Sequence, residues 1–284
     1  MLIRFLLQER ARWLLMSITM TLIIGCKSTA SRPPLWTNSL GMQFSEVPLV
    51  SREQPDQKLS PKILVAVFET ADRDFAAFCL ATGQNLDQRG KSCNPARQVS
   101  WHEAVAFCKW LTQKERAKGI LRPGQSYRLP TDHEWSCAVG IGHLEKPSES
   151  AESKDGRIPD QYPWGAAWPP PERAGNLCGA ESQSEFPENH IVGYKDCYSG
   201  EKVGRRASVP NCLGLHDLSG SLWEWCADPF RSSKSWRVLR GGSWLTCRPQ
   251  TLLSSHRTHD PENYRSASVG FRCVLAEDQI TSPN

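Results

Sequence analysis

The stretch "QVSWHEAVAFCKWL", residues 98–111, carries the clearest structural signal in the chain. Ser100 and Glu103 form a capping box, in which the serine hydroxyl accepts a hydrogen bond from the third helical N–H and the glutamate reaches back to the N-cap amide. Apolar side chains then recur at helical spacing on one face, namely Trp101, Ala104, Val105, Cys108 and Leu111. We therefore expect an amphipathic helix from residue 101 to about residue 118, closed by Gly119.

Two further helices are expected on either side of this one. The stretch "TDHE", residues 131–134, is a second capping box and predicts a shorter helix through Cys137. On the N-terminal side, we expect Thr70 to cap a helix that runs to about Thr82 and is stopped by Gly83.

Several segments have the β-branched and alternating apolar residues that are typical of strands. They are residues 39–50, 61–70, 221–226, 237–244 and 268–275. Residues 140–215 lie between the last expected helix and the strand expected at 221–226. They are rich in Gly, Pro, Ser and polar residues and lack apolar periodicity. So long a loop inside a compact domain needs some other source of order, and bound metal ions would supply one.

Composition and charge exclude some classes of function. The 284 residues are 39% hydrophobic and 23% charged, with a formal net charge of only +4, so nothing indicates a nucleic-acid partner. We find no internal repeat and no linker after residue 34, which favours one domain.

The N-terminus is typical of an exported protein. Basic residues precede the apolar run "WLLMSITMTLIIG", residues 13–25, which is too short to span a membrane but suits a signal-peptide core. The run ends in "LIIGC", which resembles the bacterial lipobox and implies lipidation of Cys26. Lys27 in place of Asp implies the outer rather than the inner membrane. The alternative is an uncleaved membrane anchor.

Six stretches occur in the order found in the formylglycine-generating enzyme family, also called the sulfatase-modifying factor family, which this chain resembles. They are residues 98–111, 127–135, 162–165, 214–226, 237–244 and 268–273. The resemblance implies an α+β, loop-rich, C-type-lectin-like fold with little regular secondary structure. It places a signal peptide at 1–25, a lipidated tether at 26–37, the family domain at 38–276 and a tail at 277–284.

The resemblance also says where a copper site would lie. Active members oxidise a sulfatase cysteine to formylglycine with copper(I) and dioxygen, and soft thiolates select Cu(I). In this sequence the two thiolate positions fall on Thr246 and Thr251, so copper is not expected. Ser243, Trp244 and Cys247 line the corresponding active-site region. Cys247 is then either a reactive thiol or half of a disulfide whose partner the sequence does not identify.

The family's two calcium sites map onto this chain more completely. The first would use Asn176, the Leu177 carbonyl, Asp196 and the Tyr198 carbonyl; the second would use Asp217, the Gly220 and Leu222 carbonyls, and Glu224. All are oxygen ligands, which suit Ca²⁺. The alternative is that the two aspartates only cap turns and that Glu224 pairs with an arginine.

Cysteine usage fits an oxidising compartment. Removing Cys26 from the eleven cysteines leaves ten, an even number that indicates disulfides. The resemblance implies a disulfide between Cys108 and Cys273.

Three functions remain open. The first expectation is a non-catalytic module, anchored in the cell envelope by its lipid, that binds a peptide, a sulfatase or a glycan. The alternatives are a formylglycine-generating oxidase with relocated ligands and a structural envelope protein.

Overall fold

The computed structural model describes residues 35–85, 90, 92–196, 198, 208–231 and 235–277. The predicted signal peptide, Cys26 and most of the tether, and residues 278–284 of the tail, lie outside this part of the chain. None of the helices within the described residues is long and apolar enough to cross a membrane.

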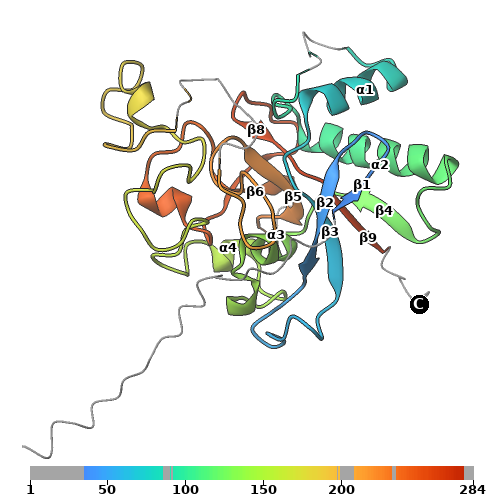
Figure 1. The fold of residues 1–284 in the computed structure, drawn as a ribbon, viewed down its shortest axis with the longest axis horizontal. Coiled ribbons are helices and arrows are strands. Elements are labelled where there is room, and N and C mark those ends of the chain that lie inside the picture. Colours follow the sequence, from blue (N-terminus) through green and yellow to red (C-terminus); the bar gives the residue numbers. More distant parts are fainter. Residues whose placement is uncertain are drawn as a thin grey trace, which may run out of the picture. The chain divides into compact units, whose positions relative to one another are not determined.

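Two β-sheets organise the described chain (Figure 1). The first is antiparallel, in the order β1-β2-β3-β9-β4, with strands Trp36–Thr37, Gln43–Pro48, Lys62–Ala66, Val274–Glu277 and Gln125–Arg128. The second has the order β7-β6-β5-β8, with strands Thr258–Pro261, Trp236–Arg240, Trp223–Pro229 and Val269–Gly270, and only its β5–β8 pair is parallel. The predicted strand at 268–275 is therefore two short strands, one in each sheet.

Both predicted capping boxes are present. Helix α2 spans Trp101–Ala117, and Ser100 accepts from the Glu103 amide while the Glu103 side chain accepts from the Ser100 amide. Helix α3 spans Asp132–Val139 and is capped in the same way by Thr131 and Glu134. These helices begin where the sequence predicts because their first turns satisfy their own N–H groups.

The expectation that Thr70 caps the first helix is wrong. Helix α1 spans Asp72–Thr82, and its N-cap is Ala71, which makes no side-chain cap. Thr70 is instead held in the core, where its amide donates to the Phe271 carbonyl and its carbonyl accepts from the Ala96 amide. Thr70 does not cap the helix because it makes tertiary hydrogen bonds to distant segments instead, which override the local signal in the sequence.

An aromatic cluster packs α1 against α2 and both against the segment between the sheets. Phe75 and Phe107 stack with ring centroids 5.8 Å apart, and Phe271 meets Phe107 edge to face at 5.5 Å. Phe78 completes the cluster against Phe107. All four rings are buried, so they form part of the apolar core that packs against the first sheet.

The stretch 140–215 forms a loop-rich layer, as expected. Its described residues include the short helix α4, Ala151–Lys154, and two 3₁₀ turns, Gly142–Leu144 and Ala180–Ser182. A small hydrophobic cluster orders it, formed by Tyr162, Ala174, Leu177, Ile191, Tyr194 and Leu252. The architecture is thus α+β with extensive irregular structure.

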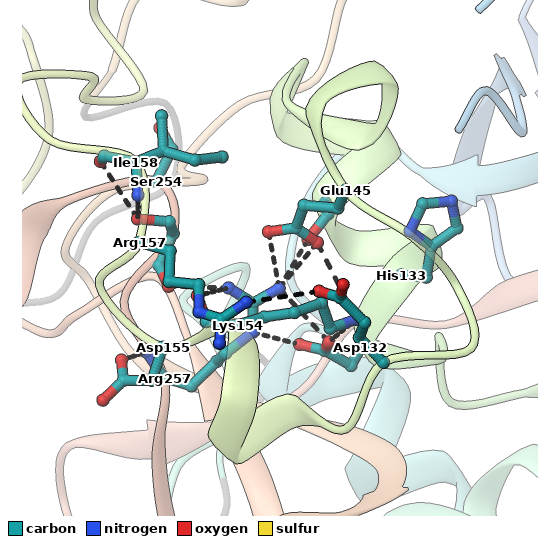
Figure 2. A network of polar contacts seen from close by, with 12 residues as sticks. Asp132, His133, Glu145, Lys154, Asp155, Arg157, Ile158, Ser254 and Arg257 are labelled. Atoms are coloured by element: carbon teal, nitrogen blue, oxygen red, sulfur yellow. Dashed lines mark hydrogen bonds and ion pairs between the residues drawn. The ribbon is translucent and has the colours of Figure 1, made fainter. Parts of the chain in front are cut away.

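A buried ionic network fixes the start of α3 to this layer (Figure 2). Lys154 Nζ lies 2.6 Å from Asp132 Oδ2, and Arg257 Nε lies 2.9 Å from Asp132 Oδ1. Arg240 also contacts Asp132 Oδ1, and Arg257 donates to Glu145 at 2.8 Å. All five side chains are buried. Burial by itself raises the pKa of Asp132, but the three cations outweigh it and hold that pKa well below its usual range.

Replacing Asp132 by Asn removes the anion that three buried cations share. We expect Asp132→Asn to lower the free energy of unfolding by about 3–5 kcal/mol at pH 7, because unpaired buried charges are costly. The depressed pKa means that the carboxylate stabilises above its unfolded pKa of about 3.9 and loses this effect as the pH falls. The difference between wild type and variant, measured by urea unfolding, should therefore be smaller at pH 3 than at pH 7.

The matched control is Glu152→Gln. Glu152 pairs with Arg231 at 2.9 Å, but their side chains are 50% and 59% exposed. This variant should change stability by less than about 1 kcal/mol. Equal effects of the two variants would show that the buried network does not carry the predicted energy.

Candidate functional site

The loop that follows β6 forms a tight turn over residues 241–246. Gly241 and Gly242 have φ angles of 93° and 80°, in the left-handed region that favours glycine. The turn closes when the Ser243 amide donates to Thr246 Oγ1 at 2.9 Å. The Gly-Gly-Ser sequence is therefore explained by backbone geometry.

Ser243 and Trp244, predicted to line an active-site region, are both buried in this turn. Ser243 is 1% exposed, and its Oγ accepts from the Leu245 amide at 3.3 Å. Trp244 is 5% exposed and packs with Leu222 and Phe186. Neither residue presents a reactive or stacking group to solvent. The next residue, Leu245, is 42% exposed.

Of the first predicted calcium set, the structure brings Asp196 to the backbone amides of Leu177 and Tyr198, while the Leu177 carbonyl accepts from the Gly179 amide at 2.8 Å. Asp196 Oδ2 accepts from the Leu177 amide at 2.7 Å, and Oδ1 accepts from the Tyr198 amide at 2.8 Å. The Asn176 carbonyl accepts from the Ser221 amide at 2.7 Å. Burial raises the pKa of Asp196 to about 6. A carboxylate buried this way, with lone pairs beyond its two amide partners, fits a cation ligand.

The second predicted set has a different partner. Glu224 is 1% exposed, and both its oxygens are bound by Arg272, with contacts of 2.6 Å from Nη2 and 2.7 Å from Nε. The Trp135 indole also donates to Glu224 at 2.9 Å. A cation at this position would have to displace Arg272, so the arrangement matches the arginine-pairing alternative for Glu224.

The other members of the second set make hydrogen bonds within the protein. Asp217 Oδ1 accepts from the Ser208 amide at 2.9 Å. The Gly220 amide donates to the Gly241 carbonyl at 2.9 Å, and the Leu222 amide donates to Glu69 at 3.0 Å. Within the residues that the structure describes, there is no cluster of three or more His, Cys, Asp or Glu side chains arranged to hold a metal ion.

Glu69 is a buried acid that the sequence reasoning did not single out. Its carboxylate accepts from Ser221 Oγ and the Leu222 amide, each at 3.0 Å. Burial, and then the neighbouring Asp217 and Glu224, raise its pKa well above the ordinary value. A glutamate directly after an apolar strand, as in "KILVAVFE", and an arginine inside "VGFRCV" are the signals that indicate buried charge.

The predicted cysteine pair meets in the core. Cys108 Sγ and Cys273 Sγ are 3.6 Å apart, and both residues are at most 1% exposed. A disulfide bond is about 2.05 Å long, so the two sulfurs are neighbours without being bonded in this structure. The disulfide stays a prediction.

A comparison with models of protein families finds one family that contains these residues. The model of the sulfatase-modifying factor enzyme 1-like domain matches residues 57–277. The chain belongs to the sulfatase-modifying factor family. The match covers α1, α2, the loop-rich layer and the turn over residues 241–246.

Known relatives of this sulfatase-modifying factor domain include active and inactive proteins. The chain is 29% identical over 186 residues to the inactive C-alpha-formylglycine-generating enzyme 2 of Bos taurus, covering 63% of this chain and 50% of that protein. It is 29% identical over 205 residues to the formylglycine-generating enzyme of Thermomonospora curvata, covering 64% and 55%. The chain thus spans about half the length of these relatives.

A solved structure shares the fold of this sulfatase-modifying factor domain. PvdO from Pseudomonas aeruginosa aligns with a TM-score of 0.51 at 17% identity, covering 87% of this chain and 99% of that one. At this identity the likeness concerns the fold alone.

The two residues that the resemblance predicts at the copper positions, Thr246 and Thr251, carry hydroxyls that do not suit copper(I). Thr246 is 8% exposed, and its Oγ1 accepts from the Ser243 amide. Thr251 Oγ1 donates to the Arg248 carbonyl at 2.9 Å. Both hydroxyls are hard, neutral ligands already used inside their own turns, whereas Cu(I) selects soft thiolates.

Calcium is expected to stabilise this domain through the Asp196 set. A ligand at one hundred times its Kd adds about 2.7 kcal/mol, which for a domain of this size corresponds to about 5–10 °C in Tm. Added Ca²⁺ should raise the Tm of metal-free wild type by that amount, and Asp196→Asn should abolish the response. The measurement is thermal unfolding with Ca²⁺ or EDTA.

The control for this titration is Glu188→Gln, an exposed acid in the same loop-rich layer. It should respond to Ca²⁺ like the wild type. A wild-type Tm that is the same in Ca²⁺ and in EDTA would contradict the calcium prediction.

Proposed function

We propose that this protein is a non-catalytic member of the sulfatase-modifying factor family that binds an extended peptide. The observation that carries the proposal is the pair Thr246 and Thr251, whose hydroxyls stand where thiolates would hold copper and are bonded within the loop. We further propose that a lipid on Cys26 anchors it in the cell envelope, at the outer rather than the inner membrane.

The chemistry of the family reaction supports the non-catalytic assignment. Oxidising a cysteine with dioxygen requires a redox-active metal that holds the substrate thiol, and neither threonine supplies a ligand suited to Cu(I). Ser243, the nearest other hydroxyl, is buried and donates or accepts only within the turn. Cys247 is half-buried and stands one residue beyond the first position.

A cavity beside α2 offers a place for the peptide. Its volume is about 450 Å³, and it lies between α2 and β4, with walls that include Trp101, Val105 and Leu129. Lys109 and Arg116 stand at the cavity as basic groups. Apolar walls with a basic rim suit a peptide that combines an apolar side chain with acidic neighbours, and suit a glycan less because sugar hydroxyls need polar partners.

The competing function is a formylglycine-generating oxidase with relocated ligands. The 29% identity to the Thermomonospora curvata enzyme favours it to the same degree as the identity to the inactive Bos taurus protein favours the proposal. Sequence similarity therefore does not choose between them, and turnover must be measured.

We expect the purified protein to leave a sulfatase-type peptide, containing the sequence Cys-x-Pro-x-Arg, unchanged. The protein would be incubated with this peptide, Cu(I) and dioxygen, and the peptide mass followed against a copper-only control. Conversion of the cysteine to formylglycine faster than in that control would overturn the proposal.

The double variant Thr246→Cys/Thr251→Cys is the companion to this assay. It should bind Cu(I) at least about a hundredfold more tightly than the wild type, because it replaces two hydroxyls with thiolates. Equal copper affinity of the two proteins would show that these positions do not decide the missing activity.

Peptide binding is tested at the basic rim of the cavity. A phage-displayed peptide library should enrich sequences that contain aromatic and acidic residues, and Lys109→Glu should weaken their binding about tenfold or more through charge reversal. Lys114→Glu is the matched control, since Lys114 lies over the Trp110 ring on the same helix and does not line the cavity. Equal loss in both variants, or enrichment of basic peptides, would contradict the site.

A further inference from the structure

We propose that Cys178 and Cys247 form an intramolecular disulfide that ties the loop-rich layer to the turn over residues 241–246. The sequence leaves the partner of Cys247 open, and the two cysteines are far apart along the chain. The bond would be a covalent modification at the edge of the loop that carries Thr246.

A backbone hydrogen bond brings the two residues together. The Cys178 amide donates to the Thr246 carbonyl at 3.2 Å, so the chain at residue 178 runs beside the peptide bond that joins Thr246 to Cys247. Cys247 directly follows Thr246, so it lies one residue from this contact, and a disulfide needs Cα atoms about 4.4–6.8 Å apart.

Both cysteines also border the same hydrophobic cluster. Leu177, next to Cys178, belongs to the cluster with Tyr162 and Leu252, and Cys247 packs against it. Cys178 is 1% exposed and Cys247 is half-buried. One thiol is therefore protected while the other is within reach of a reagent.

The electrostatics agree with close approach of the two thiols. Burial, and then the nearby Cys247 thiol, raise the pKa of Cys178 to about 11. Cys178 Sγ donates to the Asn189 carbonyl at 3.0 Å, a bond that holds it in the protonated form and that is given up on oxidation.

The reaction is a thiol–disulfide exchange with a small disulfide such as oxidised glutathione. The Cys247 thiolate attacks one glutathione sulfur, forming a mixed disulfide as one glutathione thiolate leaves. Cys178 then loses its proton and attacks the Cys247 sulfur, and the second glutathione leaves. Two protein thiols are oxidised to one disulfide, and one glutathione disulfide is reduced to two thiols.

The bond would fix a defined part of the domain. The Cys178 carbonyl accepts from the Ile191 amide at 2.7 Å, so Cys178 lies in the loop that leads to Asp196. Linking it to Cys247 ties the loop with the predicted calcium ligands to the loop with the family's active-site positions. An oxidising compartment, which the N-terminal signal predicts, would maintain the bond.

The test is peptide mapping of the full-length protein after reduction and reoxidation with oxidised glutathione. Free thiols are alkylated, the protein is digested without reductant, and linked peptides are identified by mass. We expect a peptide pair joined through Cys178 and Cys247. Alkylation of both, or a link from either one to another cysteine such as Cys197, would overturn the proposal.

Two variants separate this bond from general oxidation. In Cys178→Ser, Cys247 should carry one glutathione that persists, because the resolving thiol is gone. In Cys93→Ser, which removes an exposed cysteine elsewhere, the 178–247 link should form as in the wild type. If Cys178→Ser fails to fold, Cys247→Ser replaces it and should leave Cys178 alkylated only after denaturation. A Cys178 that reacts rapidly in folded Cys247→Ser would contradict the protected thiol.

Discussion

The guanidinium of Arg272 connects the two sheets, and their relative position depends on it. It binds both oxygens of Glu224 in β5 of the second sheet, and it donates to the Ala66 carbonyl at 3.1 Å at the end of β3 of the first. It also donates to the carbonyls of His216 and Asp217. Arginine suits this place because its fork of five N–H groups can serve a carboxylate and several carbonyls at once. Its full burial leaves no water to replace any of these partners, so the sheets are held in one relative position.

Local signals in the sequence predicted the helices because those signals are complete within four residues. The two capping boxes place α2 and α3 at their observed first residues. The assignment of Thr70 failed because its partners, Phe271 and Ala96, lie in distant parts of the chain. The same limit applies to the site. The residue types around Asp196 and Glu224 were foreseen, but Glu224 and Arg272 are 48 residues apart, and nothing near either one specifies the other.

The function proposed above separates the family fold from the family chemistry. The fold uses glycines with positive φ, buried ion pairs and an aromatic cluster, and all of these are present. The family reaction needs two soft ligands at the positions of Thr246 and Thr251. The fold needs only a hydrogen bond to the Ser243 amide and one to the Arg248 carbonyl, and the two threonines make both. Under the proposed function, a hydroxyl keeps the loop in shape without supplying a ligand for copper(I), because a fold alone does not define a function.

The place of β9 in the first sheet has a consequence for biosynthesis. Residues 274–277 lie between β3 and β4, so these two strands join one sheet only through a segment that is made after both. Until it emerges, β3 and β4 each lack a partner on their inner edge, and the sheet remains open in the middle. The first sheet is therefore completed only when the last described strand of the domain has been made.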